Sequence, residues 1–212
     1  MRHFFRSLLY IMCTGFLCSC SKDEGRIPNL LTEVCDVFIN ADSIATTATL
    51  DDGTVLDIAR QRMKANAKDT LIRSVITYTQ EDGTVRVYSN TPVICKMATP
   101  SEKFKTTPHD PVKLISIWQK GPYINMMFGE MTTGKGIHEY GFCMDSVKNR
   151  MLYVSFIHKQ PAEDALSYTQ KRYASMPVKT EGTEAYDSVS LSITTFKGLE
   201  RFTYSSSKHL FP

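Results

Sequence analysis

The sequence predicts an all-β protein made of two successive β-rich halves. Short apolar runs alternate with polar residues, and turn-forming residues separate these runs. A stretch from residue 99 to 111 is rich in proline and has few large apolar side chains, so it contributes little to a core. We therefore expect a β-rich domain at residues 30–98, a linker at 99–111 and an antiparallel β-sandwich domain at 112–212.

Residues 1–19 predict a lipoprotein signal peptide that is removed from the mature protein. Two arginines precede an apolar run of about ten residues, too short to span a bilayer, which takes roughly 20. Ser19 supplies the small side chain that a signal peptidase needs before Cys20, and Leu17 holds the usual branched position. The alternative is an ordinary signal peptide in which Cys20 has no special part.

Acyl chains on Cys20 would anchor the mature chain to a membrane without a transmembrane helix. Each buried CH₂ contributes about 0.8 kcal/mol, and two or more chains anchor a protein stably. Residues 20–29 form a polar tether, and its start resembles the surface-export signal of Bacteroidota lipoproteins: Ser21, Lys22, Asp23 and Glu24. We expect an outer membrane lipoprotein exposed at the cell surface. The alternative is a solvated tether on a lipoprotein that faces the periplasm.

Composition excludes a nucleic-acid partner and leaves no cofactor or metal motif. Without the signal peptide the 25 basic side chains fall to 23, against 22 acidic ones, so no basic face is expected. Cys35, Cys95 and Cys143 remain for the folded part, and their wide spacing matches no metal-binding motif. Three buried thiols are the first interpretation, and a disulfide between Cys35 and Cys95 is the second.

The first half contains two turn signals, each ending in a glycine, that predict hairpins. Gly53 and Gly83 each follow an aspartate, and Asp-Gly between apolar-rich runs is typical of a type I′ turn, in which both central residues have positive φ. Residues 58–68 weakly favour a helical turn or an irregular crossover. The strands that flank the two turns are expected at residues 46–50, 54–58, 71–79 and 84–88.

The second half predicts a sandwich of about seven short strands. Residues 188–196 alternate most regularly, with Val189, Leu191 and Ile193 on one face and hydroxyl side chains on the other. A Gly-rich turn at 133–136 is expected to close a hairpin, and Pro161 to open a short helix. The other strands are expected near residues 112–119, 123–128, 137–144, 152–157, 172–176 and 201–205.

Several short motifs, taken in order, resemble the NigD-like lipoproteins of Bacteroidales. They are the acidic tail of the signal, Leu50-Asp51-Asp52-Gly53-Thr54, Ser74-Val75-Ile76-Thr77-Tyr78, Val93-Ile94-Cys95-Lys96, Tyr123-Ile124-Asn125 and Tyr173-Ala174-Ser175-Met176-Pro177. The resemblance covers nearly the whole mature chain. It implies that the first domain is an OB-like barrel and the second a β-sandwich. The family takes its name from a bacteriocin gene cluster, and it offers no catalytic residue.

The candidate catalytic motifs are incomplete. His138-Glu139 lacks the second histidine of a HExxH site, and a strand would point the two side chains to opposite faces. His109-Asp110 has no nucleophile beside it. The turn at 133–136 lacks the long loop and the helix of a phosphate-binding motif. We expect a protein that is not an enzyme, with a hydrolase of dispersed active site as the alternative.

Trp118 and Tyr123 are the candidate ligand-binding residues. They flank the tight Gly121-Pro122 turn, so both rings would line one rim and stack on a sugar. The competing interpretation places Trp118 on the core-facing side of its strand, together with Val112 and Leu114.

The function expected from the sequence is that of a non-enzymatic, lipid-anchored envelope protein that binds a protein or peptide partner. A role in the handling of a bacteriocin follows from the family resemblance. The alternative is a surface module that binds glycans through Trp118 and Tyr123. Neither interpretation needs a cofactor.

Changing Asp23 and Glu24 together to alanine is expected to leave lipidation of Cys20 intact but to retain the protein in the periplasm. The reason is that the change removes the acidic charges of the export signal while leaving the cleavage site in place. Protease accessibility on whole cells measures exposure, and mass spectrometry of the N-terminal peptide measures lipidation. Unchanged accessibility would contradict the export interpretation.

Overall fold

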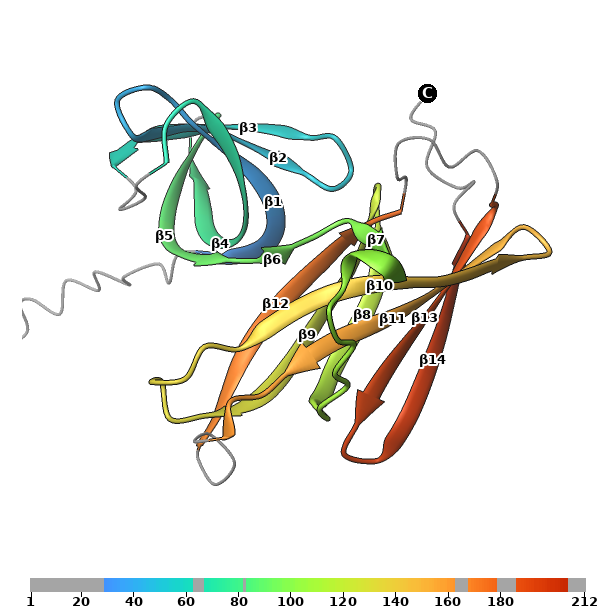
Figure 1. Cartoon of the computed structure of the whole chain (residues 1–212). Coiled ribbons are helices and arrows are strands. Elements are labelled where there is room, and N and C mark those ends of the chain that lie inside the picture. The colour runs from blue at the N-terminus through green and yellow to red at the C-terminus, as the bar shows by residue number, and fades with distance from the viewer. Residues whose placement is uncertain (1–28, 63–66, 82, 163–167, 179–185, 206–212) are drawn as a thin grey trace, which may run out of the picture.

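The computed structural model describes residues 29–62, 67–81, 83–162, 168–178 and 186–205 (Figure 1). These residues are almost entirely β, as the sequence predicts, apart from one short 3-10 turn, η1 (Ser101–Lys103). The signal peptide, Cys20 and the export signal lie outside the described residues, as does most of the helix expected after Pro161. The described part holds no helix of the length and apolar character that crossing a membrane requires.

Five strands close an N-terminal barrel in the order β1-β2-β3-β5-β4. Neighbouring strands are antiparallel except β3 and β5, which pair in parallel. A closed five-stranded barrel of this kind is the OB architecture, so the OB-like barrel that the resemblance implies is present. The strands are β1 (Leu31–Ile39), β2 (Ile44–Leu50), β3 (Val55–Arg62), β4 (Thr70–Glu81) and β5 (Thr84–Pro92).

The barrel interior is filled by the alternate side chains of its strands. On β1, Cys35, Val37 and Ile39 are fully buried inside the barrel, and Ile76 of β4 lies among them. Because successive side chains of a strand point to opposite faces, the residues between them lie on the outside of the barrel. One consequence is that Asp36 of β1 and Arg73 of β4, which are register partners, face outward together.

The second body is a sandwich of two sheets with a continuous apolar core between them. One sheet has the order β14-β13-β11-β10-β7 and the other the order β6-β12-β9-β8. Phe128 packs edge-on against Phe156 at the centre of this core. The strands are β6 (Ile94–Cys95), β7 (Ala98–Pro100), β8 (Lys113–Lys120), β9 (Tyr123–Thr132), β10 (Glu139–Lys148), β11 (Met151–Lys159), β12 (Tyr168–Pro177), β13 (Ser188–Thr195) and β14 (Gly198–Ser205).

The boundary between the two bodies differs from the expected one. The barrel strands end at Pro92, and both β6 and β7 already belong to the sandwich, where they pair in parallel with β12 and β10. His109 and Val112 also bridge to the sandwich, to His158 and Thr195. Residues 99–111 are therefore held along the sandwich rather than forming a free linker. Pairings of two or three residues leave no periodic signal in a proline-rich stretch, which is why the sequence does not reveal them.

Three local predictions need correction. The first turn is a three-residue loop in which only Gly53 has positive φ, so it is not type I′. Residues 58–62 continue strand β3 and are not helical. The turn at 133–136 does not close a hairpin, because β9 and β10 belong to different sheets and the loop crosses between them.

The three thiols of the folded part are unpaired with one another. Cys35 lies inside the barrel and Cys143 is buried, but Cys95 lies exposed on the edge strand β6. The interpretation of three buried thiols is therefore wrong for Cys95. Burial raises the pKa of the Cys35 thiol to about 12, which makes it unreactive at neutral pH.

A thiol-alkylating reagent is expected to modify Cys95 first in the folded protein, because its side chain alone of the three is exposed. Cys35 and Cys143 should react only after unfolding. Peptide mass mapping before and after denaturation measures this order, and Cys95→Ser is the control that removes the fast reaction. A peptide linking Cys35 to Cys95 in a non-reduced digest would overturn the assignment.

Candidate functional site

A β-bulge in strand β8 decides where Trp118 points. The register between β8 and β9 shifts between Leu114 and Ser116, so the alternation of side chains changes phase there. Leu114 and Ile117 both pack against the sandwich core, whereas Trp118 lies on the opposite face, toward the barrel. The interpretation that places Trp118 on the face of Leu114 is therefore wrong.

The outer face of the four-stranded sheet packs against the outer face of β1 and β4, and a buried ion pair lies at the centre of this junction. Arg73 donates from Nη2 to both carboxylate oxygens of Asp51, at 2.8 and 3.0 Å. The side chains of Arg73 and Asp51 are only 2% and 1% exposed. The sandwich completes the pair, because the same Nη2 donates to Asn125 Oδ1 at 2.9 Å and Asn125 Nδ2 donates to Asp51 at 2.9 Å.

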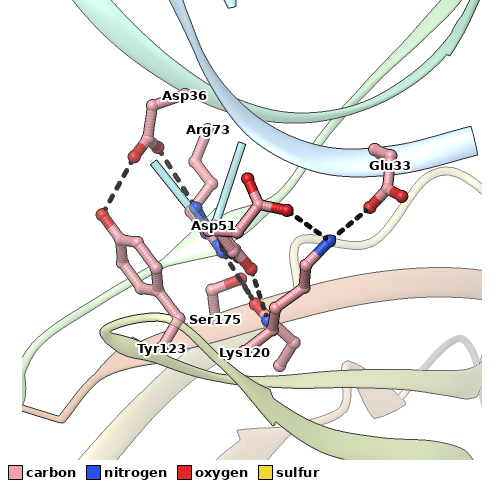
Figure 2. Close-up of polar contacts among 9 residues, drawn as sticks. Glu33, Asp36, Asp51, Arg73, Lys120, Tyr123 and Ser175 are labelled. Carbon is pink, nitrogen blue, oxygen red and sulfur yellow. Dashed lines mark hydrogen bonds and ion pairs between the residues drawn. The ribbon is translucent and has the colours of Figure 1, made fainter. Parts of the chain in front are cut away.

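Tyr123 covers this ion pair from the sandwich side (Figure 2). The guanidinium carbon of Arg73 lies 3.4 Å from the centre of the Tyr123 ring, a cation–π contact, and the Tyr123 hydroxyl donates to Asp36 at 3.1 Å. Burial, followed by the charge of Asp36, raises the pKa of Tyr123 to about 12. One face of the ring is thus occupied by Arg73, and the hydroxyl is used by Asp36.

The electrostatics of the ion pair show how far it has been removed from water. Burial raises the pKa of the Asp51 carboxyl above its ordinary value, and the charge and hydrogen bonds of Arg73 oppose that rise. Ser175 adds a further hydrogen bond, donating to Asn125 Oδ1 at 2.6 Å. The Asp51 carboxylate, Arg73 Nη2 and the Asn125 amide are therefore paired across the two domains, and these contacts hold one domain on the other. The buried Nε of Arg73 has no hydrogen-bond partner among the described residues.

A second, more exposed ion pair lies at the rim of the junction. Lys120 Nζ lies 3.0 Å from Glu33 and 3.6 Å from Asp52, with about a third of its side chain exposed. Burial lowers the pKa of Lys120, but the hydrogen bond and charge of Glu33 outweigh this effect and raise it overall. This pair is screened by solvent and contributes little stability.

The turn between β8 and β9 must carry a glycine for the domains to meet. Gly121 has φ +55°, and a Cβ at this position would lie 1.8 Å from the carbonyl oxygen of Asp51. Backbone from one domain therefore touches backbone from the other at this point. The Gly121-Pro122 turn, which the sequence analysis treats as the rim of a ligand site, is part of the docking contact.

Trp118 lines a cleft of about 300 Å³ beside the junction. Tyr173 and Met127 lie with it on the sandwich side, and Val34 and Val75 on the barrel side. The structure thus places Trp118 and Tyr123 on the same sheet face but in different roles. Trp118 borders a small cleft, while Tyr123 packs on Arg73 and donates a hydrogen bond to Asp36.

A groove of about 750 Å³ lies on the outer face of the five-stranded sheet. Its floor is made of small hydroxyl side chains, because the core-facing residues of β11 and β13 alternate with serine and threonine. Ser155 and Ser192 are register partners at its centre, and Ser192 pairs in turn with Arg201 of β14. The groove is lined by His109, Asp145, Ser146, Lys148, Tyr153, Ser155, Ser192, Thr194, Leu199 and Arg201.

The groove offers hydrogen-bonding groups of both kinds and charges of both signs. Asp145 accepts a hydrogen bond from Ser155 at 2.6 Å, so its position on the floor is fixed. Lys148 and Arg201 supply positive charge, and Tyr153 and His109 supply aromatic rings. Its volume lies within the range of about 300–1,000 Å³ that is usual for ligand sites. The sequence signal for this groove is the row of hydroxyl residues opposite Val189, Leu191 and Ile193.

The histidine motifs at 138–139 and 109–110 both lie in the sandwich. His138 is buried against His158, whereas Glu139 points to solvent and pairs with Lys159, so the two do lie on opposite sides. His109 lies at the groove, with its Nδ1 at 3.2 Å from the carbonyl oxygen of Phe156. Cys20 and residues 21–24 lie outside the described part of the chain.

Solved structures with the same fold come from Bacteroidales. A NigD-like immunity protein from Bacteroides caccae aligns with a TM-score of 0.65 at 20% identity, over 84% of this chain and 98% of its own. A candidate toxin-related protein from Parabacteroides distasonis aligns at 0.64 and 17%, over 85% and 96%. A candidate lipoprotein from Bacteroides fragilis aligns at 0.57 and 11%, over 84% and 97%. No protein-family model and no curated protein sequence matches the chain.

These likenesses concern the fold. The resemblance to NigD-like proteins is confirmed at that level, because the alignments span both the barrel and the sandwich. At 11–20% identity they assign no ligand and no residue role to this chain.

Replacing Arg73 with methionine is expected to destabilise the protein by about 3–5 kcal/mol, because Asp51 would be left buried without its partner. Lys120→Met removes a charge from the same junction but from a partly exposed pair, so it should cost no more than about 1 kcal/mol. Chemical denaturation of both variants beside the wild type measures the difference. Equal losses would show that the Arg73 pair is not the dominant contact.

Proposed function

We propose that this chain is a NigD-like lipoprotein: a non-enzymatic envelope protein, anchored through lipid on Cys20, that binds a protein or peptide partner in the groove of the five-stranded sheet. The observation that carries the proposal is the groove itself, a hollow of about 750 Å³ lined by ten residues, most of them polar. It is large enough for an extended segment of several residues.

The chemistry of the groove favours a polypeptide. A peptide backbone presents a hydrogen-bond donor and an acceptor at nearly every residue. The serine and threonine hydroxyls of the floor can both accept from the donor and donate to the acceptor. Asp145 lies on one side of the groove floor and Arg201 on the other, which suits a ligand with charges of both signs. Rows of small side chains also leave room for the backbone of the partner to approach the sheet.

The fold supports the same assignment. The barrel and sandwich together match a NigD-like immunity protein along nearly its whole length. Immunity is a function exercised by binding, and the candidate lipoprotein of the same fold agrees with anchoring at Cys20. A bacteriocin is the partner class that this likeness suggests for the present chain.

Glycan binding is the second candidate function, and a specific observation weakens it. Sugars are held largely by stacking on aromatic rings, and Tyr123 is covered by Arg73. Trp118 and Tyr153 lie apart, one in the cleft at the junction and the other in the groove. A glycan array with the wild-type protein tests this candidate directly, and a blank array would remove it.

The partner proposal is tested by capture from a native envelope extract, with mass spectrometry of the proteins retained. Arg201→Glu reverses a charge in the groove and should reduce partner recovery at least about tenfold, since a hydrogen bond to a charged group contributes about 1.5–3 kcal/mol. Ser192→Arg should act in the same direction by filling the floor.

Ser89→Arg is the matched control, because Ser89 is an exposed serine on the barrel strand β5. It should recover the same partner as the wild type. The absence of any partner specific to the wild type, or equal recovery by Ser192→Arg and Ser89→Arg, would count against the groove.

A further inference from the structure

Two histidines and a glutamate meet inside the sandwich, at the end away from the barrel. Strand β9 begins at the domain junction, and Glu130 lies near its other end. His138 directly precedes β10, and His158 lies near the end of β11. The side chains of Glu130 and His138 are 0% and 4% exposed, and His158 is 1% exposed, so three potential ligands share a nearly dry space.

The distances in this cluster suit a metal ion. His138 Nδ1 lies 3.0 Å from His158 Nε2 and 3.6 Å from Glu130 Oε2, and all three ligand atoms lie within 4.8 Å of one another. A tetrahedral zinc site with bonds near 2.0–2.1 Å has ligand atoms about 3.3 Å apart. The observed separations fall on either side of that value, so small side-chain movements would complete the site.

The outer contacts orient His158 as a ligand. Its Nδ1 lies 3.0 Å from the carbonyl oxygen of Asp110, and donating there leaves the Nε2 lone pair directed at the cluster. The Asp110 backbone is itself fixed, because its N–H donates to the His158 carbonyl at 2.9 Å.

Glu130 is held so that one oxygen faces the histidines. Arg172 donates to Oε1 at 2.8 Å, and Tyr140 donates its hydroxyl proton to Oε2. The arginine therefore occupies the far oxygen, whereas Oε2 accepts one hydrogen bond from Tyr140 and keeps a second lone pair for a metal. The rings of His138, Tyr140 and His158 are parallel within 9°, so the Tyr140 hydroxyl is placed beside the same space.

The geometry points to a binding site for a divalent transition-metal ion, with Zn²⁺ as its simplest occupant, formed by Glu130 Oε2, His138 Nδ1 and His158 Nε2. Imidazole and carboxylate ligands suit zinc and its neighbours in the first transition row, and two histidines with one glutamate leave a fourth position open. The sequence does not predict this metal site, because the three ligands lie far apart in the chain and form no spaced motif.

Metal binding requires one proton to move. Without metal, the His158 donor is used by Asp110, so His138 donates from Nδ1 to His158 Nε2. When Nδ1 of His138 takes the metal, its proton transfers to Nε2 of the same ring, and both imidazoles remain neutral. The metal then replaces a hydrogen bond that otherwise joins β10 and β11.

The experiment uses the mature lipoprotein, stripped with a chelator and titrated with Zn²⁺ by calorimetry and with Co²⁺ by visible absorption. One equivalent should bind, Co²⁺ should show the spectrum of a tetrahedral nitrogen–oxygen site, and Zn²⁺ should raise the melting temperature. His138→Gln should weaken Zn²⁺ binding about 100-fold or more, since even loss of an outer contact costs about 10–100-fold.

Glu139→Gln is the matched control, because Glu139 follows His138 in the chain but points to solvent and pairs with Lys159. It should bind Zn²⁺ as the wild type does. Glu130→Gln provides a second test that keeps both histidines, and circular dichroism verifies the fold of each variant. Absence of stoichiometric binding to the wild type, or equal binding by His138→Gln and Glu139→Gln, would show that the cluster is only a hydrogen-bonded network.

Discussion

The Arg73–Asp51 ion pair sets the arrangement of the whole molecule. Both groups come from the barrel, but Asn125 and Tyr123 of the sandwich complete their environment. A charged pair removed from water needs further hydrogen bonds to offset its lost hydration, and Asn125 supplies two of them here. Separation of the domains would expose half of that arrangement, so the pair holds the two bodies in one orientation rather than simply adding stability.

This constraint determines which faces of the two domains are buried against each other and which face stays open. The outer face of β1 and β4 and the turn that carries Asp51 are used for docking, and so is the outer face of the four-stranded sheet around Asn125. What remains open is the opposite side of the sandwich, where the groove lies. If lipid on Cys20 anchors the chain, as we propose, the barrel stands between that anchor and the sandwich in the order of the chain.

The sequence predicts strands well where one face is buried and the other wet. Residues 188–196 alternate cleanly, and β13 occupies nearly that range. Prediction fails where the pattern depends on partners distant in the chain. The bulge near Ile115 reverses the face of Trp118, and β6 and β7 are too short for any period. Strand β1 is also not among the expected strands, although its buried residues alternate.

The groove can be predicted from the sequence and the histidine–glutamate cluster cannot, because only the groove depends on a local pattern. The serines of the groove are the polar residues that alternate with apolar ones along a strand, and this alternation can be read from the local sequence. The histidine–glutamate cluster depends on the inter-sheet loop at 133–136, which the sequence predicts as a hairpin. A hairpin would place β10 beside β9 in one sheet, with His138 at its turn. The crossing instead brings His138 between the sheets, opposite Glu130 of one sheet and beside His158 of the other, so the cluster exists only because the loop changes sheets.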